Sequence, residues 1–92
     1  MKYRRISKER LRTMRAHIYE YELEDGTRQL EFWSYNTPMV ICVGGRTFVN
    51  ENTYSATTRK HLSAFDDDYG IDRFSKNVEF MTEKEMYSLA VN

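Results

Sequence analysis

The stretch HIYEYELEDGTRQLEFWSY, residues 17–35, indicates the fold of the chain more clearly than any other part of the sequence. In its first half tyrosine and glutamate alternate, which is the two-residue period of a β-strand. Asp25-Gly26 follows, a dipeptide typical of hairpin turns because both residue types tolerate positive φ. The side chains beyond the turn alternate again. The sequence therefore predicts an antiparallel hairpin with strands at residues 17–23 and 28–35.

A second hairpin is predicted immediately downstream. Pro38 is expected to interrupt the strand ladder, because proline has no N–H to donate. Residues 39–43 are an unbroken apolar run, which is typical of a buried central strand, and we expect Cys42 to pack there as a small apolar residue. A Gly44-Gly45 turn then leads into a strand at residues 46–50. Together the two hairpins predict a four-stranded antiparallel meander.

The meander is followed by a predicted helix from about Thr58 to Phe65 or slightly beyond. Ser55 or Thr57 supplies the capping oxygen, and apolar side chains recur at helical spacing. The three aspartates at 66–68 oppose the helix dipole at a carboxyl end. We therefore expect the helix to stop near them, before Gly70.

The last part of the chain predicts a strand at residues 77–81 and a terminal helix. Thr82 and Glu85 form a capping box, which marks the start of that helix. The predicted fold class is therefore α+β: a small antiparallel sheet of four to five strands, one helix packed across it and a short C-terminal helix. We expect a single domain over residues 1–92, because two domains would each be too small to bury a stable core.

The first 15 residues form a basic arm. They contain seven Lys or Arg residues and one Glu, a net charge of +6, and residues 16–92 carry −6. Residues 8–16 fit a short helix capped by Ser7, but residues 14–18 also alternate as a strand does. Such an arm can contact phosphates or an acidic partner, or it can fold as a solvated segment onto its own acidic domain.

Composition excludes several classes of protein. No apolar run reaches the roughly 18 residues of a membrane helix, and no apolar stretch follows the basic amino terminus as in a signal peptide, so we expect a cytoplasmic protein. A single cysteine excludes an intrachain disulfide, and two histidines leave little material for a metal centre. The sequence contains no recognisable catalytic signature, and we expect a non-enzymatic protein without cofactor or metal.

Three groups of residues are candidate sites. The helix start at residues 57–61 combines hydroxyls, two cations and an imidazole, which suits either an anion site or an ordinary cap. The aspartates at 66–68 and Asp72 lack the spacing of a calcium loop, but they can imitate phosphate charge toward a basic partner. The surplus aromatic residues either fill the small core or form a binding surface.

Two short motifs occur together, Ser34-Tyr35-Asn36-Thr37-Pro38 and the segment 54–61. The pair resembles S-Y-x-T-P and Y-S-x-T-T-x-K-H, a motif pair of small uncharacterised bacteriophage and plasmid proteins, over about residues 17–65. The resemblance implies a mobile genetic element. Small proteins of such elements include inhibitors that bind and block host defence complexes, anti-CRISPR proteins among them.

Two hypotheses follow. In the first, the chain is a phage or mobile-element accessory protein that binds and inhibits a host defence nuclease complex in the bacterial cytoplasm. We expect it to act as a monomer or homodimer. Its partner is a host protein or ribonucleoprotein, and it contacts no membrane. Its acidic and aromatic contacts are Asp66, Asp67, Asp68, Asp72, Tyr54, Tyr69 and Trp33. In the second, the chain is a small nucleic-acid-binding regulator. Its phosphate contacts are Arg4, Arg5, Arg10, Arg12, Arg15, Arg59 and Lys60.

Overall fold

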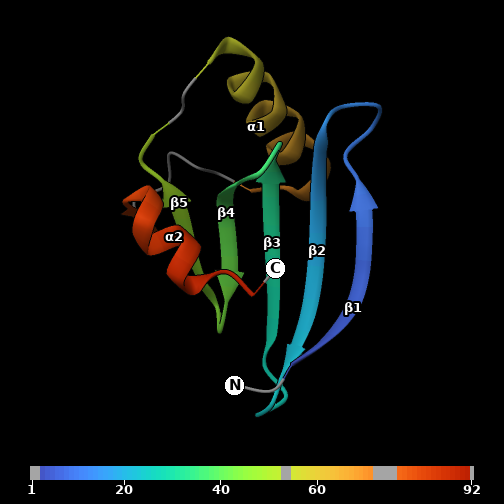
Figure 1. Ribbon diagram of the computed structural model, residues 1–92, viewed down its shortest axis with the longest axis vertical. Helices are drawn as coiled ribbons and strands as arrows, with labels where there is room; N and C mark the ends of the chain where they lie inside the picture. Colours follow the sequence, from blue (N-terminus) through green and yellow to red (C-terminus); the bar gives the residue numbers. More distant parts are fainter. Residues whose placement is uncertain (1–2, 53–54, 72–76, 92) are drawn as a thin grey trace.

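The computed structural model describes residues 3–52, 55–71 and 77–91. These residues form six strands and two helices (Figure 1). In chain order the elements are β1 (Tyr3–Arg10), β2 (Ala16–Leu23), β3 (Arg28–Ser34), β4 (Thr37–Val43), β5 (Arg46–Asn50), α1 (Ala56–Tyr69), β6 (Val78–Met81) and α2 (Glu83–Leu89).

The six strands make one sheet in the order β1-β2-β3-β4-β5-β6. The first five strands are antiparallel neighbours, and β6 pairs parallel to β5. Parallel neighbours need a crossover connection, and α1 lies within it. The predicted α+β class is confirmed, and the sheet has one strand more than the upper number expected.

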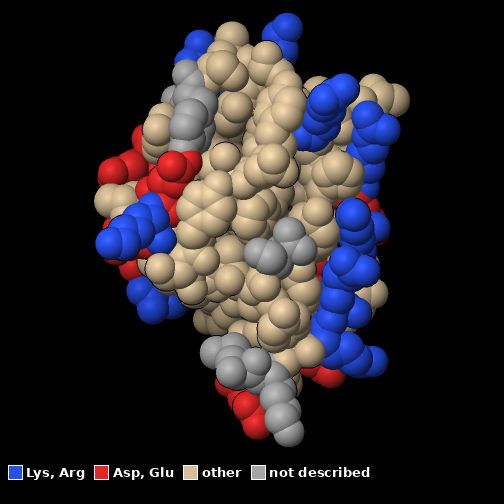
Figure 2. Space-filling view, viewed as in Figure 1, with Lys and Arg blue, Asp and Glu red and all other residues tan. Residues whose placement is uncertain are grey.

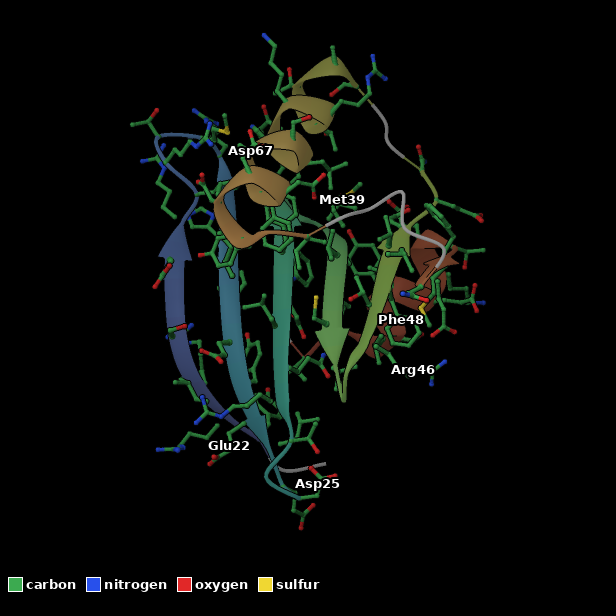
Figure 3. All side chains as sticks on the ribbon, turned by 180° about the vertical axis from the view of Figure 1, so that it is seen from behind. Glu22, Asp25, Met39, Arg46, Phe48 and Asp67 are labelled. Atoms are coloured by element: carbon green, nitrogen blue, oxygen red, sulfur yellow. The ribbon has the colours of Figure 1, made fainter. Side chains whose placement is uncertain are left out.

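The larger core lies between the sheet and α1. Phe32 of β3 stacks on Phe65 of α1 with ring centroids 4.5 Å apart, and both side chains are fully buried. Met39 lies in the same core, beneath the helix, whereas Glu22 and Asp25 lie at the end of the sheet that α1 does not reach (Figure 3). The shared core residues are Leu11, Ala16, Ile18, Phe32, Met39, Val40, Val49, Leu62, Ala64 and Phe65.

A smaller core lies on the opposite face, under α2. Met86 of this helix packs with Ile41 of β4 and Phe48 of β5. The predicted capping box starts the helix: the Thr82 hydroxyl accepts a hydrogen bond from the Glu85 amide, and the Glu85 carboxylate accepts one from the Thr82 amide. Helix α2 packs on β4 to β6 and reaches β3 through Tyr87, whose ring lies edge-on to that of Trp33 at 5.9 Å. The β1 and β2 part of this face has no helix over it (Figure 1).

The basic arm is an edge strand where the sequence also allowed a helix. Residues 3–10 form β1, which pairs along its length with β2. The chain then turns through residues 11–15, where Arg12 adopts a positive φ of 54° and the Arg10 guanidinium donates to the carbonyls of Thr13 and Met14. Of the two alternatives for residues 8–16, the helix is therefore wrong. Residues 8–10 form their backbone hydrogen bonds with β2 and residues 11–15 form a turn, so no helix forms here.

Two details of the hairpins also differ from expectation. In the first hairpin only Gly26 has positive φ, and the Asp25 carboxylate accepts a hydrogen bond from the Thr27 amide. Pro38 lies inside β4, opposite Trp33, at a point where the register shifts, and irregular pairing of this kind tolerates proline.

Helix α1 also runs further than predicted, through all three aspartates to Tyr69. Ser55 caps its start as expected, and Gly70 ends it in the left-handed conformation. Arg12 pairs with Asp68, which reduces the unfavourable interaction of the last turn with the helix dipole.

Candidate nucleic-acid interface

The pairing of β1 with β2 sorts the side chains of the basic arm between two faces. Residues directly opposite each other in an antiparallel pair point to the same side of the sheet. On the α2 side of the sheet, where no helix covers β1 and β2, Arg5 lies opposite Tyr21 and Lys8 opposite Tyr19. Arg10 lies opposite His17 on this same side. We call this surface the β1–β2 face; its residues are Arg5, Lys8, Arg10, His17, Tyr19 and Tyr21.

A bulge makes this arrangement possible. Arg5 and Lys8 are three residues apart, and in a regular strand they would point to opposite faces. The register shifts between Arg5 and Ser7, so Ile6 is the extra residue and the alternation restarts behind it. The shift brings both cations to the β1–β2 face. The sequence pattern of the arm contains no turn or glycine signal that would reveal such a bulge.

The opposite side of the same two strands carries the carboxylates. Arg4 forms an ion pair with Glu22 at 3.0 Å, and Arg28 approaches Glu20 at 3.4 Å. Glu9 accepts a hydrogen bond of 2.9 Å from the Tyr69 hydroxyl. The acidic residues that surround the arm are therefore engaged on the α1 side, away from Arg5 and Lys8.

The cations of the β1–β2 face are exposed. Among the residues that the structure describes, Arg5, Lys8 and Arg10 form no ion pair. Lys8 places its ammonium 5.7 Å from the centroid of the Tyr19 ring, within the range of a cation–π contact. A column of basic side chains follows the β1 edge (Figure 2). The edge therefore presents positive charge to solvent.

Aromatic rings lie directly beside these cations. The ring of Tyr19 lies 6.3 Å from that of His17 and 6.4 Å from that of Tyr21, centroid to centroid. Tyr19 and His17 are partly accessible, whereas Tyr21 is buried beneath an edge contact from Tyr3. Burial, with a further contribution from the Glu31 carboxylate, raises the pKa of Tyr21 to about 12.

Glu31 fixes the inner boundary of the β1–β2 face. Its buried carboxylate accepts hydrogen bonds from the Trp33 indole, the Gln29 amide and the backbone amide of Val91. Gln29 also donates to the carbonyl of Leu89 at 3.1 Å. The segment after α2 is thus held against β3 (Figure 1).

The acidic and aromatic residues of the inhibitor hypothesis that the structure describes do not form one surface. Arg12 contacts both carboxylate oxygens of Asp68, at 2.8 and 3.0 Å, and this hydrogen bonding lowers the pKa of Asp68. Trp33 is only 8% exposed, on the other face of the sheet from Asp67 and Tyr69. Tyr54 and Asp72 lie outside the described residues.

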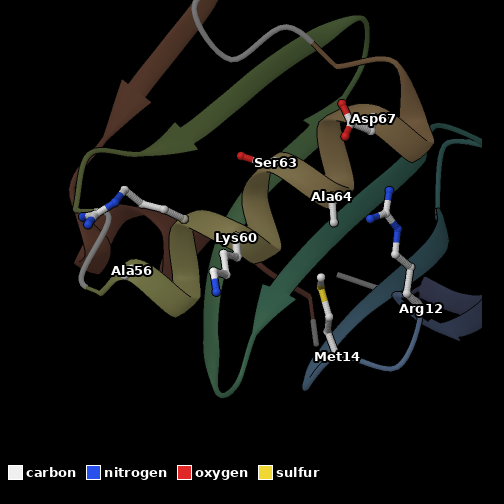
Figure 4. A pocket seen from close by; sticks show the side chains of 8 residues that line it. Arg12, Met14, Ala56, Lys60, Ser63, Ala64 and Asp67 are labelled. Carbon is white, nitrogen blue, oxygen red and sulfur yellow. The ribbon is translucent and has the colours of Figure 1, made fainter.

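The remaining predicted cations divide between sites. Arg12, Arg59 and Lys60 line an open groove of about 460 Å³ between α1 and the loop after β1, together with Asp67 (Figure 4). Arg15 is exposed in the same loop. Arg4 lies on β1 but points to the α1 side, toward Glu22. Of the seven predicted phosphate contacts, only Arg5 and Arg10 belong to the β1–β2 face. Lys8 and His17 were not predicted as contacts, and Tyr19 was expected only as one of the surplus aromatic residues.

The two motifs of the resemblance meet in space. The Ser34 hydroxyl lies 2.8 Å from Nδ1 of His61 and 3.5 Å from the Thr58 hydroxyl, and the Tyr35 ring packs 5.5 Å from the imidazole. Burial lowers the pKa of His61. Ser34 is only 2% exposed, so a substrate does not reach this serine and histidine pair. The pair joins the turn after β3 to the start of α1.

A family model matches residues 4–86, from β1 to α2. The chain belongs to DUF8033, a family of unknown function. Searches of the curated proteins and of the solved structures found no match. In the part of the chain that the structure describes, no helix is long and apolar enough to cross a membrane, and no three His, Cys, Asp or Glu residues cluster as metal ligands.

Proposed function

We propose that the protein binds nucleic acid through its β1–β2 face, with phosphates on Arg5, Lys8 and Arg10. The observation that carries this proposal is the sorting of charge between the two sides of β1 and β2. Cations that form no ion pair among the described residues lie on the side where no helix covers these strands, and carboxylates lie on the other. Lysine and arginine supply most phosphate contacts in nucleic-acid complexes.

The pairing of β1 with β2 supports the proposal. A flexible basic arm loses conformational entropy when it binds, whereas a strand paired along its length is already ordered. Arg10 is held further by hydrogen bonds to the carbonyls of Thr13 and Met14, and no described carboxylate pairs with it. The backbone that carries these cations is therefore already ordered before a polyanion binds.

The inhibitor hypothesis receives less support from the geometry. Its acidic tract is partly neutralised, because Arg12 pairs with Asp68. Asp67 is exposed on α1, but Lys60 and Arg59 line the same groove. Binding to a host defence complex through this tract stays a prediction.

The test is the salt dependence of binding for a charge variant and a matched control. Each phosphate neutralised contributes roughly −0.9 to the slope of log K against log salt on duplex DNA and roughly −0.7 on single strands. We expect Arg5→Gln with Lys8→Gln to make the slope shallower by about 1.4 to 1.8 and to weaken binding at low salt. Fluorescence anisotropy with labelled oligonucleotides measures both quantities.

The control is Arg46→Gln with Lys84→Gln. These substitutions remove the same net charge from the region of β5 and α2, near the opposite edge of the sheet, where Arg46 pairs with Glu79 at 2.7 Å. We expect the control to keep the wild-type slope. If the two double variants weaken binding equally, only net charge matters and the β1–β2 face is not the site.

A further inference from the structure

We infer that the β1–β2 face takes a single strand of DNA or RNA, with bases stacked against Tyr19 and His17 and phosphates on Arg5, Lys8 and Arg10. This inference rests on the proposed function and adds the class of nucleic acid. It comes from the position of the rings beside the cations, whereas the proposed function needs the cations alone.

Tyr19 is the centre of this surface. It lies one strand in from Lys8, and neighbouring strands are roughly 4.8 Å apart. One chain of nucleotides can therefore place phosphates over β1 and bases over β2. Each base stacked on an aromatic side chain contributes favourably whatever its identity, because every base has a π-face.

A duplex cannot use the same rings. Its bases are stacked inside the helix, and it offers only phosphates and groove edges to a protein. The rings of Tyr19 and His17 stand beside one another along β2, 6.3 Å apart, on a strand that is continuous with the sheet. No element of this surface projects as a helix or ribbon that would enter a groove. A duplex would therefore contact the cations and leave the rings unused.

The inner boundary also fits a narrow ligand. The segment after α2 is held over β3 by Glu31 and Gln29, through Val91 and Leu89. The accessible surface on this side of the sheet is thus limited to β1 and β2. The electrostatics agree, since Glu31, a carboxylate on this side of the sheet, is buried and already accepts hydrogen bonds from three N–H groups.

The first experiment compares short single-stranded DNA, single-stranded RNA and duplex DNA of matched sequence by fluorescence anisotropy. We expect at least one single-stranded form to bind about tenfold more tightly than the duplex. Tyr19→Leu should weaken single-strand binding by about tenfold and leave duplex binding unchanged. Tyr19→Phe keeps the ring and should retain the wild-type affinity. Phe80→Leu, at an exposed aromatic on the opposite edge of the sheet, is the matched control.

A second readout uses the unmodified protein. Trp33 is the only tryptophan, and its ring lies edge-on to Tyr19 at 6.5 Å. A base stacked on Tyr19 should change the fluorescence of Trp33, whereas a duplex held by the cations alone should not. This measurement tests the inference even where Tyr19→Leu fails to fold.

The outcomes separate the two proposals. Equal affinity for single strands and duplex, with no effect of Tyr19→Leu and no change in Trp33 emission, overturns the single-strand inference and leaves phosphate binding by β1 in place. Absence of binding to every form of nucleic acid at low salt overturns both.

Discussion

The two faces of the sheet differ in burial, although the same strands contribute side chains to both. On the α1 face, Ala16 and Ile18 of β2 are buried with Phe32 and Phe65 in the main core. On the β1–β2 face, His17 and Tyr19, which alternate with Ala16 and Ile18 along β2, are partly accessible beside exposed cations. Because strand side chains alternate, one strand can contribute to the core with one set of residues and to a binding surface with the other.

The two faces also differ in how their cations are used: a cation on the α1 side forms an ion pair, whereas its sequence neighbour on the β1–β2 face does not. Arg4 and Arg5 are neighbours in sequence, yet only Arg4 has a carboxylate partner, Glu22. Arg5 points to the other side, where its cross-strand neighbour is the ring of Tyr21. Their different roles depend on side-chain direction, which net charge per segment does not report.

The strongest test of the comparison truncates the main core. Phe65→Ala should lower the free energy of unfolding by about 3–5 kcal/mol, because Phe65 is fully buried and stacks on Phe32. The matched truncation Tyr3→Ala, at a ring 54% exposed on the other face, should cost less than about 1 kcal/mol. Urea denaturation followed by circular dichroism measures both values. Equal losses would contradict the division between a structural and an accessible face.

A second test is Glu31→Gln, which addresses the boundary of the β1–β2 face. The carboxylate offers two acceptor oxygens to three N–H groups, and an amide offers one oxygen and adds donors. We expect a loss of about 1–3 kcal/mol in unfolding free energy, and earlier cleavage of the segment after α2 by carboxypeptidase. Glu24→Gln, in the exposed first turn, serves as the control. Unchanged stability and cleavage would show that Glu31 does not hold this segment.

The smallest effect concerns pH on the α1 side. Burial lowers the pKa of His61 in the folded protein below its ordinary value of 6.5, so the unfolded chain binds a proton first as the pH falls. The folded state should therefore lose stability as the pH drops below about 6.5, and recover it above. His61→Gln should remove this dependence between pH 7.5 and 5.5 in thermal melts. If the dependence persists in that variant, another group is responsible.

The sequence predicted the elements with strong local signals. The two hairpins and the Thr82 and Glu85 capping box are confirmed. So are Ser55, one of the two expected capping residues, and the end of the helix before Gly70, although the helix runs through the aspartates near which it was expected to stop. Each depends on residues within a few positions of one another, where turn and cap chemistry decides the conformation. The contact between Ser34 and His61, one residue from each motif of the resemblance, was not predicted from the sequence.

The candidate site was harder to predict, because its residues come together by register. Lys8 was counted only as part of a basic arm, and Tyr19 only as part of an aromatic surplus. A one-residue bulge at Ile6 decides that both point to one side. The helical interpretation of residues 8–16 failed for a related reason: the partner strand lies beyond the local window that the pattern covers.

The sequence by itself therefore determined the α+β class, the antiparallel meander and the segregation of positive charge at the amino end, because periodicity, turn residues and charge are local properties of the chain. Only the tertiary structure decided that the basic segment is an edge strand, that β6 pairs parallel to β5, and that cations and aromatic rings share the β1–β2 face. These features depend on which strand pairs with which and in what register, and long-range pairing sets both.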